Sequence, residues 1–148
     1  MFASFYPMTL KIYFAGSIRG GRDDAEVYSN LIRYLATFGD VLTEHVGDSS
    51  LTESGEDGLS DTLIYDRDMG WIRQSDVVIA EVSNPSLGVG YEIGKAEDMD
   101  KPILCLYRNQ PNKRVSAMIS GNSNIRIARY DTFEQAMGHI SSFLESLK

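Results

Sequence analysis

The feature that most constrains the fold is a nearly unbroken apolar run, Val77–Val82, in the middle of the chain. Its short length and β-branched side chains are typical of a strand, and the scarcity of polar positions indicates that both faces of that strand are buried. Strands of this kind belong to parallel sheets, which need helices to connect their strands and cover their faces. The run therefore predicts an α/β fold built on a parallel sheet.

Strand-like and helix-like patterns alternate along the rest of the chain. Short apolar or β-branched segments predict four further strands, at Leu10–Ala15, Val41–His45, Ile103–Tyr107 and Ile125–Tyr130. Apolar residues at helical spacing predict four helices, at about 27–38, 60–75, 88–99 and 133–147. The first of these helices stops at Gly39, and Thr132–Gln135 has the spacing of a capping box ahead of the last one.

Five strands separated by helices predict a Rossmann-like, flavodoxin-like domain over residues 10–148, with a mostly parallel sheet and helices on both faces. Residues 1–9 are interpreted as an N-terminal tail, and residues 47–59, rich in Gly, Ser, Asp and Glu, as a loop. In such sheets ligands bind beyond the carboxyl ends of the strands, where the strand order reverses. The unusual residues of this sequence fall at those ends.

Composition narrows the ligand class and the compartment. The net charge of −7 over 148 residues argues against a duplex nucleic-acid partner, which needs a basic footprint, but allows a small phosphorylated ligand. The single cysteine, Cys105, lies in an apolar strand, which predicts a core thiol, no disulfide and a reducing compartment. No apolar stretch approaches the ~20 residues of a membrane-spanning helix, and no signal peptide is recognised. We therefore expect a soluble cytoplasmic or nuclear protein without membrane contact.

Two segments that follow predicted strands are candidates for anion binding. In Gly16–Arg22 the glycines let the backbone approach a ligand, while Ser and Arg side chains can donate to a phosphate. This segment is neither a GxGxxG fingerprint nor a P-loop, and an ordinary strand-to-helix turn with solvated arginines is the alternative. The second segment, Ser83–Glu92, places small residues at a helix start, where unpaired amides and the helix dipole favour an anion.

Two carboxylates lie on the inward faces of predicted helices. Glu92 shares a helix face with Ala96, and Asp68 interrupts an apolar stripe that includes Ile64 and Ile72. A buried carboxylate is costly unless it has a partner or a task, although Glu92 could face solvent as a dipole partner and Asp68 could be structural. Two carboxylates that converge beside an anion-binding segment suit glycosidic-bond cleavage, with one as nucleophile and the other as acid/base.

Other candidate residues carry weaker signals. His45 and His139 lack metal-ligand spacing, so we expect no metal, although His45 follows a strand and is a candidate for the border of the pocket. A Gly-x-Ser-x-Gly elbow is absent, which argues against a Ser-His-Asp triad. Asp66 and Arg67, next to Asp68, are interpreted as solvated side chains.

Together these segments resemble the 2′-deoxynucleoside 5′-phosphate N-hydrolases of the nucleoside 2-deoxyribosyltransferase superfamily. The resemblance runs from about residue 10 to 120 and is carried by Tyr13–Arg22, Val41–His45, Asp76–Glu81, Pro85–Gly94, Ile103–Leu106 and Ser116–Ile119. Residues 47–59 match poorly, and the two ends of the chain match loosely. The resemblance implies an enzyme that needs no cofactor and hydrolyses the N-glycosidic bond of 2′-deoxynucleoside 5′-monophosphates, with 5-hydroxymethyl-dUMP as one expected substrate.

The resemblance also implies roles for individual residues. Glu92 is the implied nucleophile that takes the deoxyribosyl group and yields it to water, Asp68 assists departure of the base, and Tyr13 positions Glu92. The implied phosphate-binding residues are Ser17, Arg19 and Ser86, with backbone amides around Gly16, Ile18, Gly20, Gly88 and Gly90. Ser116 is implied to reach the phosphate from the neighbouring subunit of a homodimer.

Two other functions stay open at this point. A nucleoside deoxyribosyltransferase forms the same covalent intermediate but resolves it with a second base instead of water. Such an enzyme acts on free nucleosides and does not need a set of phosphate ligands. A nucleotide-sensing module on the same fold binds its ligand without cleaving it, since a fold does not fix a function.

Overall fold

The computed structural model describes residues 9–18, 24–43, 46 and 58–148. Five strands form within these residues: β1 (Leu10–Ala15), β2 (Gly39–Val41), β3 (Val77–Glu81), β4 (Ile103–Arg108) and β5 (Arg126–Tyr130). The helices described are α1 (Ala25–Leu35), α2 (Asp61–Gln74), α3 (Leu87–Asp98), α4 (Ala117–Ser120) and α5 (Phe133–Glu145).

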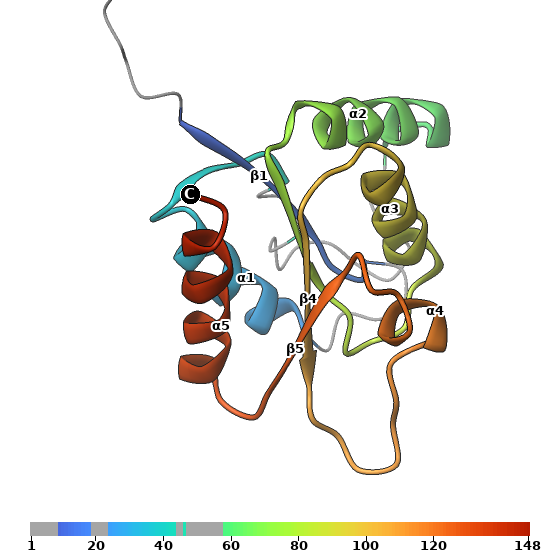
Figure 1. Cartoon of the computed structure of the whole chain (residues 1–148). Helices are drawn as coiled ribbons and strands as arrows, with labels where there is room; N and C mark the ends of the chain where they lie inside the picture. Colours follow the sequence, from blue (N-terminus) through green and yellow to red (C-terminus); the bar gives the residue numbers. More distant parts are fainter. Residues whose placement is uncertain (1–8, 19–23, 44–45, 47–57) are drawn as a thin grey trace, which may run out of the picture.

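The strands form one sheet in the order β2-β1-β3-β4-β5, and every pair of neighbouring strands is parallel. Helices α1 and α5 cover one face of the sheet, and α2 and α3 cover the other (Figure 1). The predicted flavodoxin-like α/β fold is thereby confirmed, and the described sheet is wholly rather than mostly parallel. The strand order reverses between β1 and β3, which is where folds of this kind bind ligands.

Side chains alternate between two cores along the central strands. On β1, Phe14 packs toward α1 and α5, whereas Tyr13 packs toward α2 and α3. Strand β3 is buried at every position, as its apolar run predicts. Cys105 is fully buried in the α2–α3 core, as expected, and burial raises the pKa of its thiol to about 12.

Strand β2 starts and ends earlier than the sequence predicts. It pairs with β1 over Gly39–Val41 instead of running from Val41 to His45. Its pairing stops because the Thr43 side chain takes over the hydrogen bonds of Phe14: Oγ1 accepts from the Phe14 amide at 2.9 Å and donates to the Phe14 carbonyl at 2.7 Å. His45, the predicted border of the pocket, lies outside the described residues.

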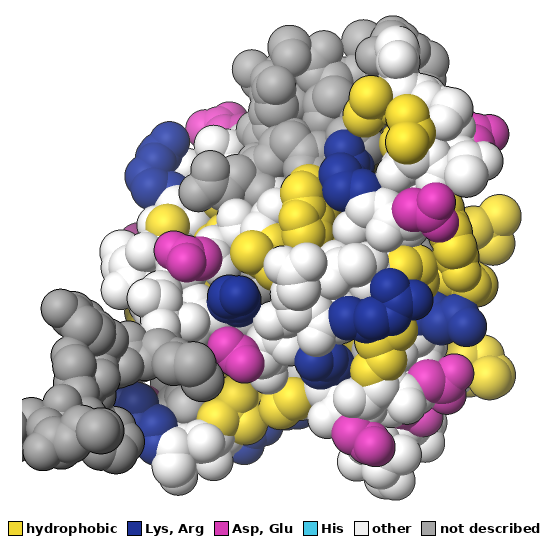
Figure 2. Space-filling view, turned by 90° about the horizontal axis from the view of Figure 1, so that it is seen from above, with side chains coloured by type: hydrophobic (Ala, Val, Ile, Leu, Met, Phe, Trp, Pro, Cys, Tyr) yellow, Lys and Arg dark blue, Asp and Glu magenta, His cyan; other side chains and the backbone are white. Residues whose placement is uncertain are grey.

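Charged side chains of both signs are distributed over the surface. On the face shown in Figure 2, Lys and Arg side chains are interspersed with Asp and Glu. Each helix in the described part of the chain is too short or too polar to cross a lipid bilayer.

Gly39 is required by the close approach of β2 to β1. A Cβ at this position would overlap the carbonyl oxygen of Leu10, so Gly39→Ala must push the paired strands apart. We expect this variant to lose about 1–3 kcal/mol of unfolding free energy in urea denaturation. The control is Gly138→Ala on the exposed side of α5, where the new methyl meets no described atom within 4 Å apart from its chain neighbours and the nearby backbone of its own helix. That variant should gain up to ~1 kcal/mol, and equal stability of the two would contradict this account.

Candidate active site

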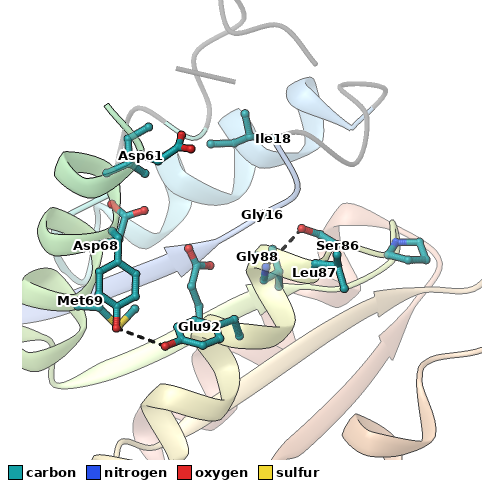
Figure 3. Close-up of a pocket in the computed structure, with 14 residues that line it drawn as sticks. Gly16, Ile18, Asp61, Asp68, Met69, Ser86, Leu87, Gly88 and Glu92 are labelled. Atoms are coloured by element: carbon teal, nitrogen blue, oxygen red, sulfur yellow. Dashed lines mark hydrogen bonds between the residues drawn. The ribbon is translucent and has the colours of Figure 1, made fainter. Parts of the chain in front are cut away.

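A cavity of about 630 Å³ lies where the strand order reverses. Its walls come from the segment after β1, from α2 and from the first turns of α3, which are far apart in the sequence. Six of the predicted site residues line it: Gly16, Ile18, Asp68, Ser86, Gly88 and Glu92. Figure 3 shows Asp68 on α2 and Glu92 on α3 facing this shared space, with Gly16 beside them. The fold therefore brings the two predicted carboxylates and both predicted anion-binding segments to one place.

Glu92 is tied to β1 through Tyr13. The buried Tyr13 hydroxyl donates to Glu92 Oε1 at 3.0 Å across 79 residues of sequence. Burial raises the pKa of Glu92 to about 8; the hydrogen bond from Tyr13 acts in the opposite direction, and the negative charge of Asp68 adds to the rise. Burial and the neighbouring Glu92 raise the pKa of Tyr13 above its ordinary value, so this phenol stays a proton donor. At neutral pH most Glu92 side chains therefore retain a proton.

Asp68 is held by its sequence neighbour Arg67. Two guanidinium nitrogens of Arg67 donate to Asp68 Oδ1, at 3.0 Å from Nε and 2.9 Å from Nη2. The same guanidinium lies 4.7 Å from the centre of the Trp71 ring. The interpretation of Arg67 as a solvated side chain is therefore wrong. The Asp68 side chain is 17% exposed, and a carboxylate with so little access to water needs a partner.

The segment after β1 rests on α1. Tyr28 accepts a hydrogen bond from the Ser17 amide at 3.2 Å, and a Cβ on Gly16 would lie 3.1 Å from the Tyr28 ring. Gly16 thus packs tightly against α1 and also lines the cavity wall. Ser17 is fully buried, and its hydroxyl finds no hydrogen-bond partner among the residues that the structure describes. The other predicted residues of this segment, Arg19 and Gly20, lie outside those residues.

The second segment forms the amino end of α3. Ser86 is the N-cap residue, and its Oγ accepts a hydrogen bond from the Val89 amide at 3.3 Å. The Gly90 amide donates to the Ser86 carbonyl at 3.1 Å, and Gly90 lines two neighbouring grooves instead of the cavity. The prediction that the Gly90 amide is available to a ligand therefore does not hold, because an amide beyond the first helical turn is already paired.

Ser116 lies in a second groove of about 780 Å³. It caps α4, with its Oγ accepting from the Met118 amide at 3.3 Å. This groove also includes Leu87 and Met118, and it shares Ser86 with the cavity. Within one chain, Ser116 therefore does not line the cavity that holds Glu92.

Two tyrosines on the cavity wall were not found by sequence reasoning. Tyr65 on α2 and Tyr91 on α3 are each about half exposed, and their hydroxyl oxygens lie 3.3 Å apart. The sequence indicates the position of Tyr65 in part, since Tyr65 precedes Asp68 by three residues and so shares its helix face. Its meeting with Tyr91 depends on how α2 and α3 pack.

The donor set of the cavity suits proton transfer and nucleophilic attack. It combines two carboxyl groups, one of them protonated near neutral pH, with a buried phenol and the amino end of a helix. Over the described ranges, no three His, Cys, Asp or Glu side chains are grouped so that they could hold a metal ion.

The raised pKa of Glu92 predicts a pH-dependent cost to stability. Between about pH 4.5 and pH 8 the unfolded chain loses the Glu92 proton and the folded protein keeps it, so unfolding becomes more favourable as pH rises. Glu92→Gln removes this cost. We expect its Tm to exceed that of the wild type by about 2 °C or more at pH 8, with a difference that shrinks toward pH 4.5. Calorimetric scans of both proteins measure this. The exposed Glu134→Gln is the control, and a Tm difference independent of pH would refute the assignment.

Comparison with known proteins places the chain in a family. The sequence model described as nucleoside 2-deoxyribosyltransferase matches residues 12–138. A protein of Tetraodon nigroviridis named 5-hydroxymethyl-dUMP N-hydrolase is 57% identical over 116 residues, which is 78% of this chain and 82% of that protein. The 5-hydroxymethyl-dUMP N-hydrolase of Mus musculus is 46% identical over 145 residues, 97% of this chain and 83% of the mouse protein.

Two solved structures share the fold. The CMP N-glycosidase BcmB of Clostridium botulinum superposes with a TM-score of 0.65 at 20% identity, covering 90% of this chain and 98% of BcmB. BlsM superposes with a TM-score of 0.66 at 20% identity, covering 93% of this chain and 91% of BlsM. At such identity the likeness shows the fold alone, whereas the family match spans most of the sequence. The chain belongs to the nucleoside 2-deoxyribosyltransferase family.

Proposed function

We propose that this chain hydrolyses the N-glycosidic bond of 2′-deoxynucleoside 5′-monophosphates, releasing the free base and 2-deoxyribose 5-phosphate. The observation that carries this proposal is the part-buried Tyr13–Glu92 hydrogen bond at a cavity that Glu92 shares with Asp68 and the amino end of α3. The names of the similar proteins from Tetraodon and mouse support it, and they make 5-hydroxymethyl-dUMP the first substrate to test.

In the proposed mechanism a carboxylate oxygen of Glu92 attacks the anomeric carbon of the sugar. The bond from that carbon to the base nitrogen breaks, and its electron pair leaves with the base, which takes up a proton. Because the pKa of Glu92 is about 8, its proton must leave before attack. Transfer of that proton through Asp68 to the departing base ionises the nucleophile and neutralises the leaving group. Water then attacks the same carbon, releases the sugar phosphate and restores Glu92.

The 5′-phosphate is proposed to lie between the two anion-binding segments. The Leu87 and Gly88 amides belong to the first turn of α3 and have no intrahelical acceptor by the geometry of a helix, so they can donate to an anion. Ser86 Oγ accepts from Val89, which leaves its hydroxyl hydrogen for a phosphate oxygen. The buried Ser17 hydroxyl is a further donor in need of a partner. Arg19, in the same segment, is proposed to supply positive charge.

The rival functions differ in what happens to the sugar of the bound ligand. A deoxyribosyltransferase passes it to a second base, and a sensing module leaves the nucleotide intact. The donors gathered at the amino end of α3 and after β1 favour a phosphorylated ligand over a free nucleoside. We therefore favour hydrolysis of the monophosphate over base transfer and over sensing.

Product analysis on a panel of deoxynucleotides, each with and without its 5′-phosphate, tests the activity. We expect base and 2-deoxyribose 5-phosphate from the monophosphates and little turnover of the nucleosides, because the phosphate ligands hold the sugar in place for attack. Chromatography of the products measures both. Rapid base exchange on plain nucleosides would instead identify a transferase, and tight binding without release of base would identify a sensor.

Two substitutions test the carboxylates within the same assay. Glu92→Gln should abolish hydrolysis while phosphate-dependent binding persists, because the amide cannot act as nucleophile. Asp68→Asn should lower kcat by about 10²–10⁴-fold, the usual contribution of a positioned proton-transfer group. Glu134→Gln on the exposed side of α5 is the matched control and should leave the rate unchanged. A Glu92→Gln variant with near-wild-type rate would remove Glu92 as nucleophile.

We also propose that the active unit is a homodimer in which Ser116 reaches the phosphate bound by the partner subunit. The groove around Ser116 shares Ser86 with the cavity. Leu87 and Met118 on this groove are 96% and 81% exposed, an unusual cost for large apolar side chains that a second subunit would remove. The buried, unpaired thiol of Cys105 supports a reducing compartment, and we propose the cytoplasm or the nucleus.

Light scattering after size-exclusion chromatography tests the dimer. Met118→Asp should give a monomer with a raised KM, because a charge on the apolar groove opposes association. Ser116→Ala should remain a dimer and raise KM for the monophosphate by about 10-fold, the loss of one hydrogen bond to a charged group. Leu147→Asp, a similar change at an exposed site near the end of α5, is the control. A wild-type protein that is monomeric and fully active would rule the dimer out.

A further inference from the structure

A buried polar cluster lies at the carboxyl ends of β3, β4 and β5, and the proposed mechanism does not use it. We call Asp24, Glu81, Ser83, Arg108 and Tyr130 the strand-end cluster. Glu81, Ser83 and Asp24 are 0%, 3% and 6% exposed. Charged groups so far from water cost free energy unless they are paired. The cluster therefore calls for a physical explanation.

Arg108, the last residue of β4, contacts both ends of the cluster. Its guanidinium Nη2 donates to Asp24 Oδ1 at 2.7 Å, and its backbone amide donates to Ser83 Oγ at 2.7 Å. Asp24 lies two residues beyond the Gly16–Arg22 segment, and Ser83 begins the segment that contains Ser86. One residue thus joins the start of α1, whose Tyr28 accepts from the Ser17 amide, to the near end of the second segment.

Asp24 contacts Arg108 in place of the capping hydrogen bond that is usual at its position. It occupies the N-cap position of α1, where an aspartate commonly accepts a hydrogen bond from an amide of the first helical turn. Its side chain makes no such bond to a described amide and accepts from Arg108 instead. The contact therefore fixes the start of α1 to the end of β4 instead of capping the helix.

Ser83 makes two further hydrogen bonds at this end of the sheet. Its amide donates to Glu81 Oε1 at 2.6 Å, and its carbonyl accepts from Gln110 Nε2 at 3.3 Å. The other carboxyl oxygen of Glu81 accepts a hydrogen bond from the Tyr130 hydroxyl. The start of the second segment is thus anchored to the ends of β3, β4 and β5, and through Arg108 to α1.

We propose that Arg108 is a positioning residue that holds α1, and with it the Gly16–Ser17 part of the first phosphate-binding segment, at a fixed separation from the second segment, through Asp24 on one side and Ser83 on the other. The inference rests on the proposed function, since these segments are the proposed ligands of the 5′-phosphate. A phosphate that takes hydrogen bonds from both segments needs them at a defined spacing, because such bonds weaken steeply with distance and angle. Arg108 acts through Asp24 and Ser83 and is not itself a phosphate ligand.

Arg108→Ala and Asp24→Asn, made singly and together in the full chain, test this role. Kinetics give kcat and KM for a deoxynucleoside monophosphate, and calorimetry gives the affinity for 2-deoxyribose 5-phosphate. We expect each single variant to raise KM and weaken 2-deoxyribose 5-phosphate binding by about 10-fold or more, with a much smaller fall in kcat. Catalysis is spared because Tyr13 and Glu92 belong to the opposite face of the sheet. The double variant should be no weaker than either single one, since both changes break the same link.

Arg129→Ala on the neighbouring strand is the matched control. Arg129 pairs in register with Tyr107, and its guanidinium lies 5.4 Å from that ring, so the variant removes one positive charge without touching Asp24 or Ser83. If Arg108→Ala does not fold, Arg108→Lys replaces it. Lysine keeps the charge but not the planar fork, so we expect it to weaken 2-deoxyribose 5-phosphate binding relative to the wild type.

Asp24→Asn distinguishes positioning from direct contact with the phosphate. If Arg108 bound the phosphate itself, loss of Asp24 would release the guanidinium and tighten binding, which would overturn the proposal. Affinities of Arg108→Ala within about twofold of Arg129→Ala would overturn it too, as would parallel losses in kcat and binding that track a fall in Tm. If 2-deoxyribose 5-phosphate binding depends on Arg108 and Asp24 as described but the wild-type protein cleaves no nucleotide, only the proposed function is contradicted.

Discussion

The parallel pairing of β1 with β3 is the constraint on which the site depends. Ala15 and Ala80 are partners near the ends of the two strands, so the segments that follow them leave the sheet side by side. The connections from these strands run to opposite faces, α1 on one side and α3 on the other (Figure 1). The cavity lies between the segment after β1, α2 and the first turns of α3. A segment after residue 15 and another after residue 81 meet there although 65 residues separate the paired alanines.

Burial at this cleft determines the chemistry of its carboxyl groups. Glu92 approaches the sheet closely enough to accept a hydrogen bond from Tyr13, and the same burial keeps a proton on Glu92 near neutral pH. Asp68 lies on the facing helix with Arg67 as its partner. One carboxyl group thus has a pKa raised by burial, whereas the other is paired with a fixed positive charge. Acid and nucleophile roles divide between two carboxyl groups when their environments differ in this way.

The two faces of the sheet contribute differently to the same site. The α2–α3 face supplies the carboxyl groups and the phenol. The α1–α5 face supports the two segments that follow β1 and β3. Tyr28 accepts a hydrogen bond from the Ser17 amide, and Arg108 joins Asp24 to Ser83. Such a division lets the two candidate anion-binding segments be anchored by polar contacts that lie apart from Glu92 and Asp68. Membership in the nucleoside 2-deoxyribosyltransferase family agrees with the function that we propose for this end of the sheet.

The sequence by itself determined the class of fold, the strands buried on both faces and the inward-facing carboxylates, because local periodicity records which side of each element is covered. It also marked the segments after residues 15 and 82 by their small residues. Only the tertiary structure decided that Tyr65 meets Tyr91 and that Asp24 meets Arg108, whereas the family resemblance already implied that Tyr13 positions Glu92. The structure also shows that the Gly90 amide donates to the Ser86 carbonyl within α3 and that Arg67 pairs with Asp68. Periodicity gives a direction for each side chain, but a hydrogen bond depends on the distance between elements, which packing alone sets.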